Sequence, residues 1–259
     1  MTTVADAITR ANSERHGALI GYLPLGFPDI DTSVEAAIAL VNAGVDVLEL
    51  GLPYSDPVMD GPIIQAATVE ALAKGFRVRD AFDAVRRIHA ATGTPVLIMS
   101  YWNLILQYGV DAFARELAEA GGAGLITPDL IPDEAGEWIA ASEQHRLERV
   151  FLAAPTSSAD RLTLITEQSR GFVYTVSTMS TTGAREDVDE AARGLVARLR
   201  AAGCTSACVG IGISTATQVR EVLEYADGAI VGSALVRALA DGGIPALTDL
   251  AQKLAEGTR

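Results

Sequence analysis

Cysteine is scarce in this chain of 259 residues, which contains only Cys204 and Cys208. Two cysteines are too few for a disulfide framework, and their neighbours supply no other cluster of metal ligands. We therefore expect two buried structural thiols and no metal site.

Long apolar runs are also absent, since none approaches the ~20 residues that a membrane-spanning helix needs. The N-terminal stretch MTTVADAITRANSERHG has no apolar segment of the kind found in signal peptides. Both absences predict a cytoplasmic protein that does not enter a membrane.

Basic residues are in the minority, with 20 Lys and Arg against 33 Asp and Glu and a formal net charge of −13. This field disfavours nucleic acid and anionic membrane surfaces as partners. An anionic substrate would have to be held by local donors rather than by the overall charge.

What the chain does have is a regular alternation of short apolar runs and helix-like segments. The runs are 18–24, 45–50, 95–100, 123–127, 149–153, 171–176, 206–209 and 228–231. Eight strands, each followed by helix, predict a closed (β/α)8 barrel, the TIM barrel, for which ~250 residues is typical. An open Rossmann-type sheet is the alternative. That fold typically has the motif G-x-G-x-x-G after an early strand, whereas this chain has PLGFPDID after its first strand. We expect residues 1–259 to form a single barrel domain.

Helical spacing of apolar residues supports the segments between the runs. Val34, Ile38 and Val41 form one face, with a capping box expected at Thr32–Glu35. Before the first run, apolar residues at helical spacing in 4–11 predict an extra N-terminal helix that covers the barrel floor. The connections after the second and sixth runs are the longest, and loops after strands lie on the face where barrels place their active sites.

Three acids stand close together in ELGLPYSDPVMDGP, residues 49–62. Alternation within the second run points Val45, Val47 and Glu49 into the barrel, with Glu49 at the carboxyl end of the strand. A buried carboxylate there is costly unless it is paired or used. Each acid also has a structural alternative. Glu49 could be hydrogen-bonded or ion-paired to neighbouring side chains, Asp60 could be the N-cap of a following helix, and Asp56 could close a turn.

Glycines mark the last two strand ends, in GIGIS (210–214) and GSAL (232–235). Barrels often bind phosphate between these two loops at the N-terminus of a short helix, where backbone N–H groups do the binding. Such a site needs no Lys or Arg. The alternative is that Gly212 and Gly232 only permit tight turns.

These motifs together resemble the tryptophan synthase α subunit family. The segment LELGLPYSDPVMDGPIIQ is similar to the family's signature, and PLGFPD, YWN, TTGAR, GIGIS and GSAL follow in the family's order and spacing. The resemblance covers essentially the whole chain. It implies a (β/α)8 barrel that cleaves indole-3-glycerol phosphate to indole and glyceraldehyde 3-phosphate in tryptophan biosynthesis.

The resemblance also implies roles for individual residues. Glu49 and Asp60 would be the catalytic acids. Phosphate would bind at Gly183, Gly212, Gly232 and Ser233, and Thr182 would belong to a mobile loop. The indole pocket would be formed by Tyr22, Met99, Ile126, Tyr174 and Ile211. Three departures from the family pattern, Met59, Trp102 and Ser180, are expected to tune loop closure and subunit contact.

The family further implies a β subunit that carries pyridoxal phosphate and receives the indole, in an α2β2 assembly, while this chain itself holds no cofactor. The docking face would include Pro53, Asp56, Asn103, Asp129 and Pro132. Two other readings remain open. One is an independent enzyme, either another phosphate-sugar barrel or a stand-alone lyase that releases free indole, and the other is a regulatory subunit with weak chemistry of its own. Turnover of indole-3-glycerol phosphate by the purified chain, measured with and without a partner subunit, distinguishes these possibilities.

Overall fold

The strands of this chain close into one ring. The computed structural model describes residues 2–176, 185–210 and 212–259. The strands are β1 (Ala18–Pro24), β2 (Val47–Gly51), β3 (Val96–Met99), β4 (Gly124–Thr127), β5 (Glu148–Ala153), β6 (Val173–Val176), β7 (Ala207–Gly210) and β8 (Gly228–Val231). Each pairs in parallel with the next, and β8 returns to β1. The predicted (β/α)8 barrel is confirmed.

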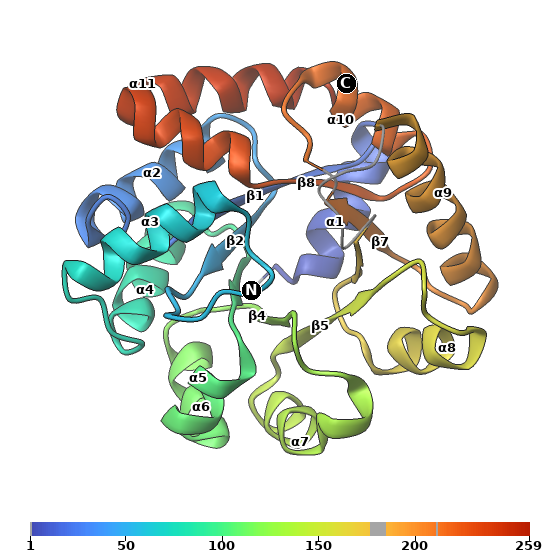
Figure 1. Cartoon of the computed structure of the whole chain (residues 1–259), viewed down its shortest axis with the longest axis horizontal. Helices are drawn as coiled ribbons and strands as arrows, with labels where there is room; N and C mark the ends of the chain where they lie inside the picture. The colour runs from blue at the N-terminus through green and yellow to red at the C-terminus, as the bar shows by residue number, and fades with distance from the viewer. Residues whose placement is uncertain (1, 177–184, 211) are drawn as a thin grey trace.

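Helices surround the ring of strands (Figure 1). They are α1 (Val4–Glu14), α2 (Ile30–Asn42), α3 (Pro62–Ala73), α4 (Asp80–Thr92), α5 (Trp102–Tyr108), α6 (Val110–Glu119), the 3₁₀ turn η1 (Pro132–Glu134), α7 (Gly136–His145), α8 (Ala159–Gln168), α9 (Arg185–Ala201), α10 (Ala216–Leu223) and α11 (Ser233–Glu256). Two helices lie between β2 and β3, which explains the long connection there. Helix α11 changes direction at Gly243, whose φ of 63° and ψ of −161° are open essentially to glycine alone.

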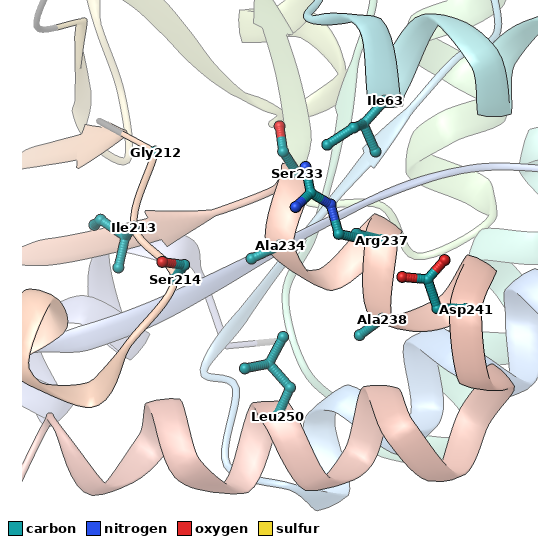
Figure 2. A pocket seen from close by; sticks show the side chains of 10 residues that line it. All are labelled: Ile63, Gly212, Ile213, Ser214, Ser233, Ala234, Arg237, Ala238, Asp241 and Leu250. Atoms are coloured by element: carbon teal, nitrogen blue, oxygen red, sulfur yellow. The ribbon is translucent and has the colours of Figure 1, made fainter.

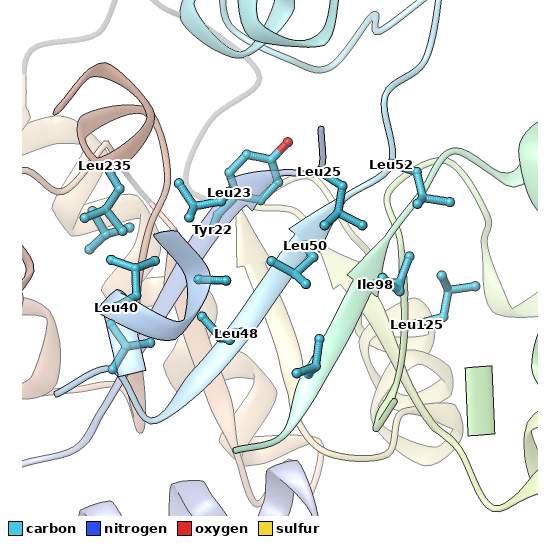
Figure 3. Packing of buried hydrophobic residues seen from close by; sticks show 14 of the residues in the cluster. Tyr22, Leu23, Leu25, Leu40, Leu48, Leu50, Leu52, Ile98, Leu125 and Leu235 are labelled. Atoms are coloured by element: carbon cyan, nitrogen blue, oxygen red, sulfur yellow. The ribbon is translucent and has the colours of Figure 1, made fainter. Parts of the chain in front are cut away.

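The strands are apolar on both sides because both sides are buried. One side packs against the helices in an outer cluster that includes Leu23, Leu48, Leu50 and Ile98 (Figure 3). The other side fills the barrel with an inner cluster: Val4, Ala7, Ile8, Ala11, Ala18, Ile20, Val47, Leu97, Ala123, Ile126, Val150, Phe172, Cys208 and Ile230. Alternation along each strand divides these residues between the two sides.

Helix α1 covers the barrel floor, as the sequence predicts. Val4 and Ile8 are almost completely buried in the inner cluster, and burial of each such side chain is worth about 1.5–3 kcal/mol. The carboxylate of Glu148 in β5 accepts hydrogen bonds from the backbone N–H groups of Val4 (2.7 Å) and Ala5 (3.2 Å). A barrel strand thus satisfies the first donors of the helix and fixes it in place.

Two local predictions are wrong. Helix α2 begins one turn earlier than the expected Thr32–Glu35 capping box, because Asp29 is its N-cap and accepts from the backbone N–H of Thr32 at 2.8 Å. Val45 packs in the outer cluster rather than inside the barrel. It precedes β2, which begins at Val47, so the strand's alternation does not reach it.

Candidate active site

Glu49 is the buried acid at the carboxyl end of β2. Its neighbours across the ladder are Tyr22 in β1 and Leu97 in β3. The side chain is 1% exposed, and within the described residues its Oε2 atom has no hydrogen-bond partner. Burial, reinforced by the charge of Asp60, raises the pKa of Glu49 to about 8. A carboxyl group in this state is protonated at neutral pH and has an oxygen free for substrate.

Asp60 reaches the same cavity from the loop after β2. Its backbone is fixed by its own N–H, which donates to the carbonyl of Pro57 (3.1 Å), and by the Gln65 amide, which donates to the Asp60 carbonyl (2.9 Å). Burial raises the pKa of Asp60 to about 6, although a hydrogen bond with Tyr101 acts in the opposite direction. The N-cap of α3 is Gly61, so Asp60 is not the helix cap that was its structural alternative.

The two acids line one cavity of ≈ 250 Å³ at the mouth of the barrel. Its wall also includes Tyr22, Met99 and Tyr174, three of the five residues expected to form an indole pocket. Ile126 instead lies in the inner cluster and is fully buried. Ile211, Thr182, Gly183 and Ser180 fall outside the described residues. The cavity therefore joins two carboxyl groups with an apolar and aromatic wall, which suits a flat ring substrate.

Gly212, Gly232 and Ser233 also line this cavity. Gly212 has a φ of 70°, a conformation that L side chains rarely adopt. Helix α11 begins at Ser233 with Gly232 as N-cap and without a side-chain cap, so its first N–H groups are open to a ligand. An anion fits there, because these donors carry the positive end of the helix dipole.

The N-terminus of the neighbouring helix α10 is capped by side chains, unlike that of α11. Its cap Thr215 accepts from the backbone N–H of Gln218, and the Gln218 amide oxygen accepts from the N–H groups of Ser214 (2.6 Å) and Thr215 (3.2 Å). This capping box uses the N–H groups of Thr215 and Gln218, so they are not open to a ligand. The N-terminus of α11, which has no side-chain cap, is the more open of the two.

A model of the family described as "Tryptophan synthase alpha chain" matches residues 8–257 of this chain. The chain belongs to the tryptophan synthase α chain family. A tryptophan synthase α chain of Leifsonia xyli subsp. xyli (strain CTCB07) is 65% identical over 257 residues, which span 99% of this chain and 98% of the relative. One from Mycobacterium avium (strain 104) is 59% identical over 242 residues, spanning 93% and 89%.

Solved structures of tryptophan synthases are also similar to this chain. A structure of Mycobacterium tuberculosis tryptophan synthase in space group F222 superposes with a TM-score of 0.94 at 52% identity, covering 100% of this chain and 99% of that one. A tryptophan synthase subunit α from Legionella pneumophila str. Paris has a TM-score of 0.91 at 32% identity, covering 100% and 98%. As a tryptophan synthase α chain, this protein is a lyase that cleaves indole-3-glycerol phosphate in tryptophan biosynthesis, and a β chain is its partner.

The residues expected at the α chain's docking face differ in exposure. Asp56, Asn103 and Asp129 are exposed, whereas Pro53 and Pro132 are buried within the chain itself and offer little surface. Asp129 also has a structural task, since its Oδ1 atom accepts from the backbone N–H of Trp102 at 2.8 Å and so caps α5.

Sequence reasoning missed the residues that hold the acidic loop of the α chain. The hydroxyl of Tyr101 accepts a hydrogen bond from the backbone N–H of Met59 at 2.9 Å, and its ring packs on Tyr54 with centroids 5.1 Å apart. Tyr101 opens the YWN motif, but no local pattern shows that it reaches a loop forty residues earlier. Met59 itself lines the substrate cavity beside Asp60.

The described helices include none with the length and apolar content needed to cross a bilayer. Residues 2–176, 185–210 and 212–259 contain no group of three His, Cys, Asp or Glu side chains placed to hold a metal ion. Cys204 and Cys208 are free and buried, as expected from the sequence.

Proposed function

We propose that Glu49 and Asp60 divide the acid–base work of indole-3-glycerol phosphate cleavage. The observation that carries this proposal is that the two carboxyl groups share one cavity and have pKa values of about 8 and about 6. At pH 7 Glu49 is mostly protonated and Asp60 is mostly ionised. One acid and one base are therefore available together before substrate binds.

The protons balance over one turnover. Protonated Glu49 donates to C3 of the indole ring, and Asp60 stabilises the ring N–H, whose acidity rises as the ring becomes an indolenine. The Glu49 carboxylate then accepts the proton of the hydroxyl next to the ring while the bond from C3 to the glycerol chain breaks. The bond electrons restore the aromatic ring, glyceraldehyde 3-phosphate forms with its new aldehyde, and Glu49 is protonated again.

The rest of the cavity orients the substrate. The open N-terminus of α11 with Gly212, Gly232 and Ser233 binds the phosphate, and Gly183 adds to this site in the proposal. Tyr22, Met99 and Tyr174 surround the ring, and Thr182, which the structure does not describe, keeps its expected role in the proposal. Binding of the phosphate holds indole C3 close to Glu49. This lowers the entropic part of the activation barrier, because the reacting groups are already in position.

The partner completes the proposal. We infer an α2β2 assembly in which the β subunit carries pyridoxal phosphate and receives indole directly, while this chain uses no cofactor of its own. Exposed apolar side chains follow three successive strands: Val58 after β2, Leu106 after β3 and Ile131 after β4. Val58 and Ile131 lie in loops, and Leu106 lies in the short helix α5 that directly follows β3. Segments that follow the strands share one face of a barrel, so we propose that these residues supply an apolar contact surface near Asp56, Asn103 and Asp129.

We further place the chain in the cytoplasm as one catalytic domain, residues 1–259. Two free buried cysteines suit a reducing compartment. The barrel supports a single domain because β8 pairs with β1 and α1 closes the floor with residues from the start of the chain.

The decisive experiment follows indole release from indole-3-glycerol phosphate by the purified chain, with and without a cognate β subunit. The proposal expects slow cleavage by the chain alone and faster cleavage in the complex. High activity that the β subunit does not change would indicate a stand-alone lyase. Absence of cleavage in both samples would favour the interpretation of this chain as a regulatory subunit.

A further inference from the structure

The substrate cavity continues past its phosphate end into a second cavity of ≈ 430 Å³, and Gly212 and Ser233 line both. The second cavity lies between α3, the loop after β7 and the two halves of α11 (Figure 2). Among the described residues that line the two cavities, Arg237 is the only cation. We propose that Arg237 binds the substrate's phosphate group together with the open N-terminus of α11.

The position of Arg237 on the helix supports this role. It follows Ser233 by four residues, so the two side chains lie on the same face of α11, one turn apart. Side chains on a helix lean towards its N-terminus, which here is the anion end. Both residues line the second cavity, and Figure 2 shows the Arg237 side chain directed away from Asp241, towards the Ser233 end of the helix.

No protein group competes for this guanidinium within the described residues. Arg237 makes no ion pair or hydrogen bond there, although Asp241 stands four residues further along the same helix. A cation that precedes an acid by four residues has the less favourable order for a helical pair. The guanidinium is therefore available to a ligand at the helix N-terminus.

The charge of the substrate supplies the physical reason for a cation. A phosphate monoester carries about −1.5 to −2 charges at pH 7, whereas a helix N-terminus offers roughly half a positive charge. The chain as a whole has a net charge of −13, which repels such an anion. One guanidinium beside the helix end offsets part of this repulsion and presents paired N–H donors to the phosphate oxygens.

The inference rests on the proposed function of the same site, and the test keeps the two apart. Indole-3-glycerol phosphate cleavage by the α–β complex is measured for wild type, Arg237→Gln and Arg237→Lys, together with competitive inhibition by glycerol 3-phosphate. Arg237→Gln should raise KM and the inhibition constant by about three- to tenfold, because the guanidinium is exposed and partly screened. The turnover number should change by less than about twofold, since the contact is the same in ground and transition states.

Two comparisons separate phosphate binding from a general effect of charge. Arg10→Gln is the matched control, because Arg10 is also exposed and without an ion pair in the described structure, but lies on α1 at the barrel floor. It should leave both constants unchanged. Arg237→Lys keeps the charge but loses the paired N–H donors, so it should recover only part of the affinity. Binding of indole, which has no phosphate, should be unaffected by any of the three variants.

An unchanged KM in Arg237→Gln, or an equal loss of affinity for indole and glycerol 3-phosphate, would overturn the inference. The same rise in KM for Arg10→Gln would assign the effect to net charge and also overturn it. A wild-type complex that fails to cleave the substrate would instead contradict the proposed function itself.

Discussion

The hydroxyl oxygen of Tyr101 accepts a 2.9 Å hydrogen bond from the backbone N–H of Met59 and thereby ties the acidic loop to the end of β3. The same hydroxyl bonds to the Asp60 side chain and lowers its pKa, against the larger effect of burial. Tyr101 is itself buried, and burial raises its pKa to about 12, so it remains a neutral phenol. Tyr101 thus contributes both to the position of the loop and to the ionisation of Asp60.

Tyr101→Phe is therefore expected to raise the pKa of Asp60 and to lower kcat about two- to tenfold, the worth of a typical hydrogen bond. Because Asp60 acts as a carboxylate, the acid limb of the kcat/KM profile should move to higher pH. Tyr54→Phe is the matched control, since Tyr54 packs on Tyr101 but its hydroxyl makes no hydrogen bond in the described structure. An acid limb that stays in place would show that Tyr101 only supports the fold.

The pH dependence of wild type should be bell-shaped, because cleavage needs ionised Asp60 and protonated Glu49. Activity rises through the pKa of Asp60, about 6, and falls through that of Glu49, about 8. Asp60→Asn should remove the acid limb and lower kcat by about 10²–10⁴-fold. Its melting temperature should not fall, because Gly61 rather than Asp60 caps α3. Full activity of Asp60→Asn at pH 7 would exclude Asp60 from the chemistry.

Glu49→Gln should lose catalysis and gain stability. The folded protein raises the pKa of Glu49 from 4.5 to about 8, so ionisation favours the unfolded chain. The wild-type side chain therefore costs stability as pH rises from about 4.5 to about 8, and the neutral amide does not. Melting temperatures of the two proteins should diverge over this window, with the variant more stable at the higher pH. A constant difference across the window would show that folding does not raise the pKa of Glu49.

The same residues show how far the sequence predicts this molecule. Eight strands were predictable because barrel strands are buried on both sides and leave apolar runs, and alternation was enough to point Glu49 inwards. Alternation failed at Val45, just outside its strand. The role of Tyr101 and the one proposed for Arg237 were not predictable. The first depends on a contact between residues 42 positions apart, and the second on a guanidinium that has no ion pair among the residues that the structure describes. Such facts depend on three-dimensional placement, which no local pattern encodes.

Partner docking gives the last prediction. Leu106 and Ile131 are 49% and 44% exposed after adjacent strands β3 and β4, and Val58 is 83% exposed on the loop that leads to Asp60. A β subunit that covers Val58 would restrict this loop and keep Asp60 at the cavity, which couples docking to catalysis. The buried Pro53 and Pro132 are poor probes, because replacing them would disturb the chain's own packing.

Leu106→Ser and Ile131→Ser should therefore weaken association with the β subunit by about tenfold or more each if they lie at the centre of the interface. Their cleavage rates without the partner should match wild type, which serves as the internal control for folding. Val58→Ser should differ from both by reducing activation at saturating β subunit, because it acts on the loop as well as on affinity. Titration of each variant with the β subunit, followed by indole release, measures both quantities. Wild-type affinity and activation in all three variants would place the partner on a different surface.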